Sequence, residues 1–220
     1  MDTNKKAVLF DLDGTLIDSK PGIFNAIDYT MEQLHLPMLS EETKDRFIGP
    51  SIGTSFRDVC GFDEETVQTA ITLFRTYYKA QGMFECALYP QLDALIRLLR
   101  SQGKMIALAT KKPEVFAIEI LKKLGVFDLF DVVCGADYAD TSAHKTYIIE
   151  RAVEACGCPK EACVLLGDTR FDCIGAGEAG IECIGVAYGY GTVEELREHG
   201  AVSIAADANE LAHLLCGVSL

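Results

Sequence analysis

The chain has 220 residues, of which 20 are Lys or Arg and 33 are Asp or Glu, so its formal net charge is −13. This length suits one main domain with a smaller insertion. The negative charge argues against a nucleic acid polymer as partner, because such a polymer would be repelled by the average surface. Although 49% of the residues are hydrophobic, no apolar run approaches the roughly 18 residues of a membrane span, so we expect no membrane partner.

The nine cysteines are scattered along the chain. Cys156 and Cys158 form a C-x-C pair, but no second Cys or His pair follows at zinc-finger spacing. The N-terminus has two lysines and then enters an acidic segment, which is too short and too acidic for a signal peptide. We therefore expect reduced thiols and a cytoplasmic protein.

Five short apolar segments predict the strands of a buried sheet. Helical patterns separate them, and this alternation is typical of a parallel sheet covered by helices on both faces. The strand segments are AVLF (7–10), MIALAT (105–110), DVVC (131–134), CVLLG (163–167) and ECIGVA (182–187).

The helical patterns occupy 90–100, 114–124, 145–156 and 171–179. Apolar residues recur at helical spacing in each of the first two. The first pattern has Leu92, Leu95, Ile96 and Leu99, with Pro90 suited to its first turn. The face predicted to be buried in the second consists of Val115, Ile118, Leu121 and Leu124.

The strand pattern is absent from 16 to about 87, where long helical segments such as PGIFNAIDYTMEQLHL and DEETVQTAITLFRTYYKA dominate. The predicted fold class is therefore α/β. A Rossmann-like parallel-sheet core is formed by 1–15 and 88–220, and residues 16–87 form an inserted helical domain. We expect this insertion to close over the carboxyl ends of the strands.

Acidic residues gather where the predicted strands end. The segment AVLFDLDGTLIDS places Asp11 and Asp13 directly after the first strand, and GDTRFD places Asp168 and Asp172 after a later one. In a parallel sheet these ends meet at one edge. Because carboxylates crowded there repel one another, they need a cation. The donor set suits Mg²⁺, and Lys145 at the start of a helix adds a second cation.

The other groups at this edge suit a phosphoryl group. The hydroxyl of Thr110, the turn at Gly14, the backbone N–H groups after Pro113 and the ammonium of Lys145 together form an anion cradle. One carboxylate can attack phosphorus, and a second one two residues along the chain can give a proton to the leaving oxygen. This pattern predicts phosphoryl transfer.

In this order, DLDGT, Thr110, Lys145 and GDTRFD resemble the four signature motifs of the haloacid dehalogenase superfamily, and the insertion resembles that superfamily's helical cap. The resemblance implies that Asp11 is the nucleophile and Asp13 the general acid and base. It further implies that Gly14, Thr110, Lys111 and Lys145 hold the phosphoryl group. The implied Mg²⁺ ligands are Asp11, the backbone carbonyl of Asp13 and Asp168, with Asp172 either a ligand or a support.

Three segments are similar to the phosphoglycolate phosphatase and 5′-nucleotidase-like branch: FIGPSIGTSF (47–56), ATKKPEVF (109–116) and GVAYGYGTVEEL (185–196). The resemblance implies a small phosphate monoester as substrate, with a nucleoside monophosphate favoured over phosphoglycolate. The expected specificity residues in the cap are Phe47, Ile48, Gly49 and Pro50. We expect a monomer or a weak dimer.

Several residues also have a plain structural interpretation. The side chains of Lys111 and Lys112 are expected to be solvated, His144 to lie on the surface, and Asp18 to cap a helix. YGYG (188–191) is expected to form a loop.

Rival functions stay open at this point. They include a dehalogenase, which would not need Asp13, a sugar-phosphate mutase, a phosphonate hydrolase with a Schiff-base lysine such as Lys20 or Lys44, and a phospho-ligand sensor or receiver-like module without catalysis. The complete set of four motifs favours the phosphatase.

Overall fold

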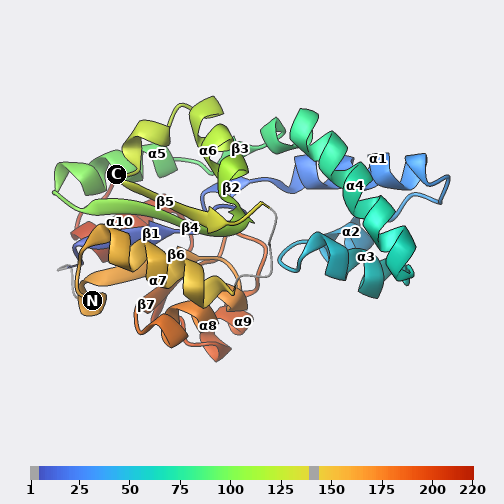
Figure 1. Ribbon diagram of the computed structural model, residues 1–220. Coiled ribbons are helices and arrows are strands. Elements are labelled where there is room, and N and C mark those ends of the chain that lie inside the picture. The colour runs from blue at the N-terminus through green and yellow to red at the C-terminus, as the bar shows by residue number, and fades with distance from the viewer. Residues whose placement is uncertain (1–4, 139–143) are drawn as a thin grey trace. The chain divides into compact units, whose positions relative to one another are not determined.

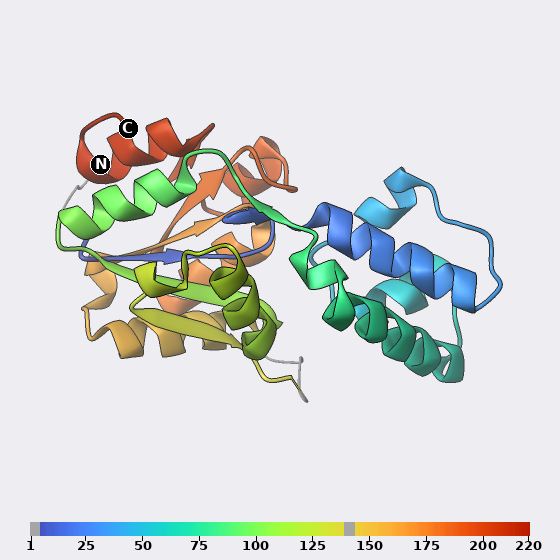
Figure 2. The ribbon, with the colours of Figure 1, turned by 90° about the horizontal axis from the view of Figure 1, so that it is seen from above.

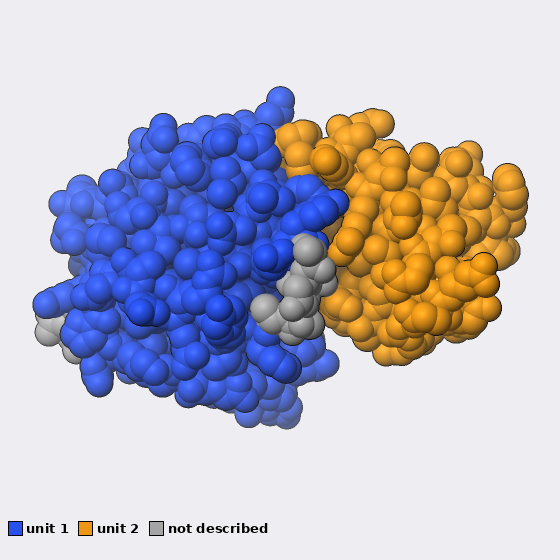
Figure 3. Space-filling view, viewed as in Figure 1, with its two compact units in different colours: residues 1–18, 87–220 blue, residues 19–86 orange. Residues whose placement is uncertain are grey.

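The computed structural model describes residues 5–138 and 144–220 (Figure 1). The chain forms two compact units, which we call the core unit (Met1–Asp18 and Ala87–Leu220) and the insert unit (Ser19–Cys86) (Figure 3). These boundaries differ by up to three residues from those expected from the sequence. The reason is a small antiparallel pair, β2 (Ile17–Asp18) with β3 (Ala87–Leu88), which holds both connecting segments in the core unit.

A six-stranded sheet organises the core unit, with the strand order β5-β4-β1-β6-β7-β8. Every neighbouring pair is parallel, as predicted. The strands are β1 (Ala7–Phe10), β4 (Met105–Pro113), β5 (Val132–Ala136), β6 (Cys163–Gly167), β7 (Glu182–Val186) and β8 (Ser203–Ala205).

Helices cover both faces of this sheet (Figure 2). Helices α7 and α8 lie together on one face and α5 and α10 on the other. The helices and 3₁₀ turns are α5 (Leu92–Ser101), α6 (Glu114–Lys123), η2 (Phe127–Leu129), α7 (Lys145–Cys156), η3 (Lys160–Ala162), α8 (Arg170–Ala179), α9 (Val193–Glu198) and α10 (Ala208–Cys216). The predicted α/β fold class is confirmed.

Strand β1 lies at the centre of the sheet, and its four residues are fully buried. Its last residue, Phe10, is in register with Leu108 of β4 and Leu166 of β6. Because the three strands run in the same direction, the residues that follow them emerge at the same edge. This register is what brings the acidic segment after β1 beside the end of β6.

Two local predictions about helices were wrong. Helix α5 begins at Leu92 and not at 90, because Gln91 takes a left-handed conformation (φ 64°) immediately before it and leaves Pro90 outside the helix. On α6, Val115 is 53% exposed, although it was expected to be buried. The residues of α6 that are buried are Phe116, Ala117, Ile120 and Leu121.

Two sets of strands were not predicted, namely β8 and the β2–β3 pair. Strand β8 has three residues, and β2 and β3 have two residues each. Strands this short do not show an alternating pattern in the sequence. Asp18, expected to cap a helix, lies in β2 instead, and the N-cap position of the following helix belongs to Ser19.

The insert unit, all of which the structure describes, contains helices and no strand. They are α1 (Lys20–Gln33), α2 (Glu41–Asp45), α3 (Ile52–Cys60), α4 (Glu64–Ala80) and the 3₁₀ turn η1 (Gly82–Phe84). Side chains of Ser40, Ser51 and Asp63 accept a hydrogen bond from the first turn of α2, α3 and α4 respectively. Aromatic rings fill its interior, with Phe56 in contact with Phe47 and Phe74.

Among the described helices of both units, none is long and apolar enough to cross a membrane.

Candidate active site

Lys145 lies between two carboxylates at the carboxyl edge of the sheet. As the first residue of α7, it places its ammonium 2.6 Å from Oδ1 of Asp11 and 2.7 Å from Oδ1 of Asp172. All three residues are buried. Burial alone would lower the pKa of Lys145, but the two carboxylates raise it above the ordinary lysine value. The lysine is therefore a permanent cation in the site.

Asp11 follows β1 directly, and its burial changes the pKa of its carboxyl group. Removal of its carboxylate from water raises its pKa from 3.8 to about 6, although the charge of Lys145 acts in the opposite direction. Nearby Asp172 and Asp13 add repulsion that also raises the pKa. At Asp11, burial therefore outweighs the stabilising charge of Lys145.

Asp168 follows β6 and is completely buried. Its Oδ1 accepts from the hydroxyl of Thr15 at 3.0 Å, and its Oδ2 accepts from the backbone N–H of Tyr190 at 2.8 Å. Gly14 makes this approach possible, because a Cβ at its position would lie 2.1 Å from Oδ2 of Asp168. Burial raises the pKa of Asp168 well above its ordinary value.

A divalent cation fits this arrangement. Oxygen atoms of Asp11, Asp168 and Asp172 lie within 4.8 Å of one another, and all three residues are buried. When they are ionised, these carboxylates carry three negative charges against the one positive charge of Lys145. Three carboxylate oxygens form the hard donor set that Mg²⁺ prefers. The donor set and its excess charge therefore suit the expected metal.

Asp172 has less freedom to act as a ligand than Asp11 or Asp168. While its Oδ1 pairs with Lys145, its Oδ2 accepts from the backbone N–H of Thr169 at 3.0 Å and from the hydroxyl of the same residue at 2.9 Å. The bond from the backbone N–H of Thr169 is one half of the capping box that begins α8. The geometry favours Asp172 as a support that holds Lys145.

Thr110 is 1% exposed and lies in an irregular part of β4, where the register with β5 shifts between Ala109 and Pro113. Its hydroxyl oxygen accepts from the backbone N–H of Lys112 at 3.1 Å. Irregularities of this kind are common beside active sites because they change where side chains point. The predicted strand ended at Thr110, and the observed one continues through the two lysines.

The carboxylate of Asp13 is separate from the acidic cluster, and Lys112 binds it. The ammonium of Lys112 lies 2.5 Å from Oδ1 of Asp13, and the lysine side chain is only 7% exposed. The expectation of a solvated side chain is therefore wrong for Lys112. It is also wrong for Lys111, which is partly buried with its ammonium 5.7 Å from the centre of the Phe171 ring.

The expected loop at YGYG contributes three contacts to the site. Besides the bond from its backbone to Asp168, Tyr190 donates its hydroxyl to Oδ1 of Asp18 at 3.1 Å. Tyr188 donates its hydroxyl to the backbone carbonyl of Thr15 at 3.0 Å. Sequence reasoning missed Thr15, Tyr188, Tyr190 and Lys112 as parts of the site. The Thr after DLDG and the aromatic pair within a glycine-rich loop were the available signals.

The insert unit shows which of the expected specificity residues are accessible. Phe47 is 4% exposed and its ring packs edge-on against Phe56, with 5.2 Å between ring centres. The expected contact between this ring and a substrate is therefore not supported, because the ring belongs to the interior of the unit. Ile48 is partly buried, whereas Gly49 and Pro50 are exposed.

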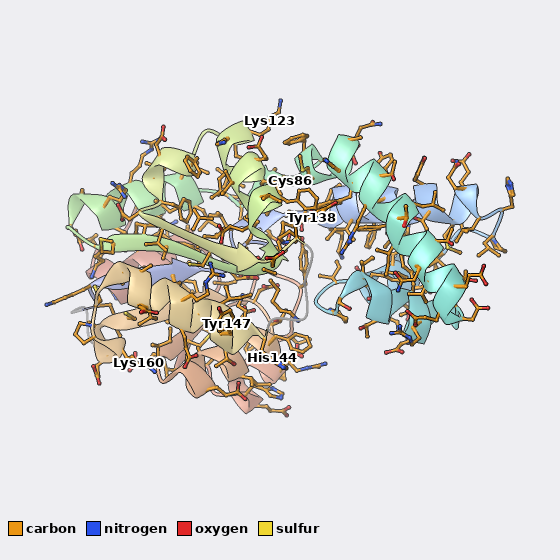
Figure 4. The ribbon with its side chains drawn as sticks, viewed as in Figure 1. Cys86, Lys123, Tyr138, His144, Tyr147 and Lys160 are labelled. Carbon is orange, nitrogen blue, oxygen red and sulfur yellow. The ribbon has the colours of Figure 1, made fainter. Side chains whose placement is uncertain are left out.

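His144 immediately precedes α7 and is exposed, as expected (Figure 4). It has no side-chain capping bond to that helix. Its neighbour Lys145 is the residue that points into the acidic cluster.

The fold and the site together define an α/β protein with a buried cluster of carboxylates at the carboxyl edge of its parallel sheet. A family model described as haloacid dehalogenase-like hydrolase matches residues 8–186. The chain belongs to this family, as the motifs predicted. The phosphatase class of enzyme is confirmed as well by the relatives and solved structures that are similar to it.

Two curated relatives and one solved structure illustrate the similarity. A 5′-nucleotidase of Pseudomonas aeruginosa is 32% identical over 208 residues, which are 94% of each chain. A phosphoglycolate phosphatase of Colwellia psychrerythraea is 30% identical over 216 residues, 94% of this chain and 95% of that one. The crystal structure of a predicted phosphatase from Clostridium acetobutylicum is 35% identical with a TM-score of 0.89, covering 97% of this chain and 99% of that one.

Proposed function

We propose that this phosphatase is a Mg²⁺-dependent phosphomonoester hydrolase that acts through a phosphoryl group bound covalently to Asp11. The observation that carries the proposal is the position of Asp11, which is buried and held by Lys145 beside Asp168 and Asp172. A carboxylate in such a place can attack phosphorus once the surrounding charge is balanced. Bound Mg²⁺ would be held by Asp11, the backbone carbonyl of Asp13 and Asp168, with Asp172 in support, and would supply positive charge for the phosphoryl oxygens.

In the first step, an oxygen of Asp11 forms a bond to phosphorus while the bond from phosphorus to the leaving oxygen breaks. Asp13, as a carboxylic acid, gives its proton to that oxygen, so the alcohol leaves neutral. Lys145 and the hydroxyl of Thr110 hold the phosphoryl oxygens. The backbone N–H of Lys111 completes the cradle. The expected donor at Gly14 is not available, because its backbone N–H donates to the carbonyl oxygen of Ile17 at 2.8 Å.

In the second step, water attacks the phosphorus of the aspartyl-phosphate. The Asp13 carboxylate takes a proton from this water as its oxygen bonds to phosphorus, and the bond to Asp11 breaks. Inorganic phosphate leaves, and Asp13 is again a carboxylic acid. One water is consumed for each ester, so the cycle balances.

For the substrate, we propose a small phosphate monoester, with a nucleoside monophosphate favoured over phosphoglycolate. The 5′-nucleotidase of P. aeruginosa supports the first choice, and the phosphoglycolate phosphatase of C. psychrerythraea supports the alternative. We assign selectivity to the insert unit, in particular to the segment from Ile48 to Pro50, whose last two residues are exposed.

We also propose a cytoplasmic enzyme that is a monomer or a weak dimer. All nine cysteines are described as thiols rather than disulfides, which suits a reducing compartment.

A panel of phosphate monoesters assayed with and without Mg²⁺ tests the proposed function. We expect Mg²⁺-dependent release of phosphate and complete loss of turnover in Asp11→Asn. Asp13→Asn should slow turnover of an alkyl ester by about 10²- to 10⁴-fold. Turnover by Asp11→Asn, or full activity in excess chelator, would contradict the mechanism.

A further inference from the structure

We propose that Lys112 is a positioning residue for Asp13: it binds one carboxylate oxygen and thereby places the transferable proton on the other. This inference rests on the proposed function, because it assigns a task to Lys112 within the acid and base chemistry of Asp13. It assigns a role to a residue whose sequence context suggested only a solvated side chain.

The ion pair between these residues differs from an ordinary surface pair. The ammonium of Lys112 lies 2.5 Å from Oδ1 of Asp13, the lysine side chain is 7% exposed and the aspartate side chain 24%. Exposed ion pairs are weak because water screens them and two long side chains must be ordered. Here the ammonium is shielded, so it can hold the carboxylate in one orientation.

The path of β4 explains how Lys112 reaches Asp13. The register between β4 and β5 is irregular from Ala109 to Pro113, and Lys112 lies within that stretch. The chain packs tightly here, since a Cβ at Gly135 of β5 would lie 2.8 Å from the backbone oxygen of Lys112. The backbone of Lys112 is therefore confined, which limits where its side chain can point.

The same residue also contacts the phosphoryl-binding hydroxyl. Its backbone N–H donates to Oγ1 of Thr110 at 3.1 Å while its ammonium binds Asp13. Lys112 thus connects the group that holds the phosphoryl oxygens with the group that protonates the leaving oxygen. A single residue sets the position of both relative to β4.

The chemical consequence concerns the two oxygens of Asp13. Since the ammonium donates to Oδ1, that oxygen acts as an acceptor, and a proton on the carboxyl group resides on Oδ2. In the first step this proton moves from Oδ2 to the leaving oxygen as the bond from that oxygen to phosphorus breaks. In the second step Oδ2 takes a proton from the attacking water. Without Lys112, either oxygen can carry the proton and the group can rotate.

Esters with different leaving groups test this role. p-Nitrophenolate is a stable anion and leaves without a proton, whereas an alkoxide needs one. We would measure kcat/KM, which reports phosphoryl transfer to Asp11, for p-nitrophenyl phosphate and ethyl phosphate in the wild type and in Lys112→Met. Loss of a positioned acid should lower the value for ethyl phosphate by about 10²-fold, and that for p-nitrophenyl phosphate by less than about threefold.

Control variants separate the selective loss with ethyl phosphate from a general loss of activity. Lys123→Met removes an exposed lysine at the end of α6 (Figure 4) and should leave both values unchanged. Lys112→Arg keeps a cation and should restore part of the rate with ethyl phosphate. If Lys112→Met does not fold, Lys112→Gln keeps a donor for Oδ1 and should show the same selective loss at smaller magnitude.

Two results would overturn the inference. An equal loss for both esters, with weaker inhibition by inorganic phosphate, would mean that Lys112 binds the phosphoryl group itself. Unchanged kcat/KM for ethyl phosphate in Lys112→Met would mean that Asp13 is positioned without it. A wild type that hydrolyses neither ester in an Asp11-dependent manner would overturn the proposed function, and the inference with it.

Discussion

Lys145 and Asp172 form a buried ion pair with 2.7 Å between the ammonium and Oδ1, and this pair joins the first turns of α7 and α8. The other oxygen of Asp172 is used to cap α8 through Thr169. Asp172 therefore supports the site through a helix terminus and through the lysine that faces Asp11. Asp172 therefore contributes both to the stability of α8 and to the balance of charge around Lys145.

The first prediction concerns the two interactions of Asp172, with Lys145 and with the start of α8. Asp172→Ala leaves the ammonium of Lys145 with one carboxylate fewer and removes the capping oxygen of α8. Lys145 keeps Asp11 as its partner and one repelling carboxylate is gone, so the free energy of unfolding should fall by about 1 kcal/mol, chiefly through the lost helix cap. Denaturant titration of Asp172→Ala and Asp172→Asn measures it. Because Asn retains a capping oxygen, it should be the milder change, and equal stability of wild type and Asp172→Ala would contradict this account.

A second prediction follows from the charge of Lys145. Lys145→Ala leaves the carboxylates of Asp11, Asp168 and Asp172 without this cation, so the protein without metal should lose stability. Mg²⁺ should restore part of the melting temperature, yet both steps of turnover should be slower. Calorimetry with and without Mg²⁺ checks the first point, and pre-steady-state phosphate release checks the second. A variant as active as the wild type would show that Lys145 is not part of the charge balance.

Metal binding gives the third prediction. Mg²⁺ at 100 times its dissociation constant should stabilise the native state by about 2.7 kcal/mol, because it binds the folded carboxylates and not the unfolded chain. Asp168→Asn should abolish this stabilisation. Glu210→Gln, which changes an exposed carboxylate of α10, is the matched control and should retain it. A Mg²⁺-dependent shift of full size in Asp168→Asn would place the metal elsewhere.

The affinity for Mg²⁺ should depend on pH through Asp11. Without metal, burial raises the pKa of this carboxyl group to about 6. A proton competes with the metal below that value, so lower pH weakens binding and higher pH restores it. Between pH 7 and pH 5 the apparent dissociation constant should rise roughly tenfold through Asp11 alone, and by more because burial also raises the pKa of Asp168. Calorimetric titrations across this range test the direction, and tighter binding at pH 5 would contradict it.

The last variant pair separates the interior of the insert unit from its surface. Phe47→Ala removes a buried ring from the contact with Phe56 and should lower the free energy of unfolding by about 3–5 kcal/mol. Ile48→Ala should cost less stability and should raise KM for nucleoside monophosphates more than for p-nitrophenyl phosphate. Unfolding curves and steady-state kinetics on both variants check this assignment. A raised KM for nucleoside monophosphates in Phe47→Ala, with unchanged stability, would instead indicate that Phe47 contacts the substrate.

The sequence predicted the parts of the site that depend on strand order. Asp11 and Asp168 follow short, fully apolar segments, and parallel neighbours bring such positions together. It did not predict the partner of Asp13, because the irregular path of β4 that presents Lys112 depends on packing against β5. The burial of Phe47 was likewise not predictable, since the segment 47–56 has one aromatic residue at each end and does not indicate which ring faces the interior. Composition and periodicity determine which elements form, whereas tertiary packing determines where single side chains point.

The most direct test of the central claim is detection of the phosphoryl group on Asp11. Asp13→Asn should still accept phosphoryl from p-nitrophenyl phosphate, because this leaving group needs no proton, while attack by water lacks its base. Mass spectrometry of the acid-quenched variant should then find the added phosphoryl group on the peptide that contains Asp11, and should find none in the Asp11→Asn, Asp13→Asn double variant. Wild-type turnover combined with an unmodified Asp11 peptide in quenched Asp13→Asn would contradict the covalent mechanism.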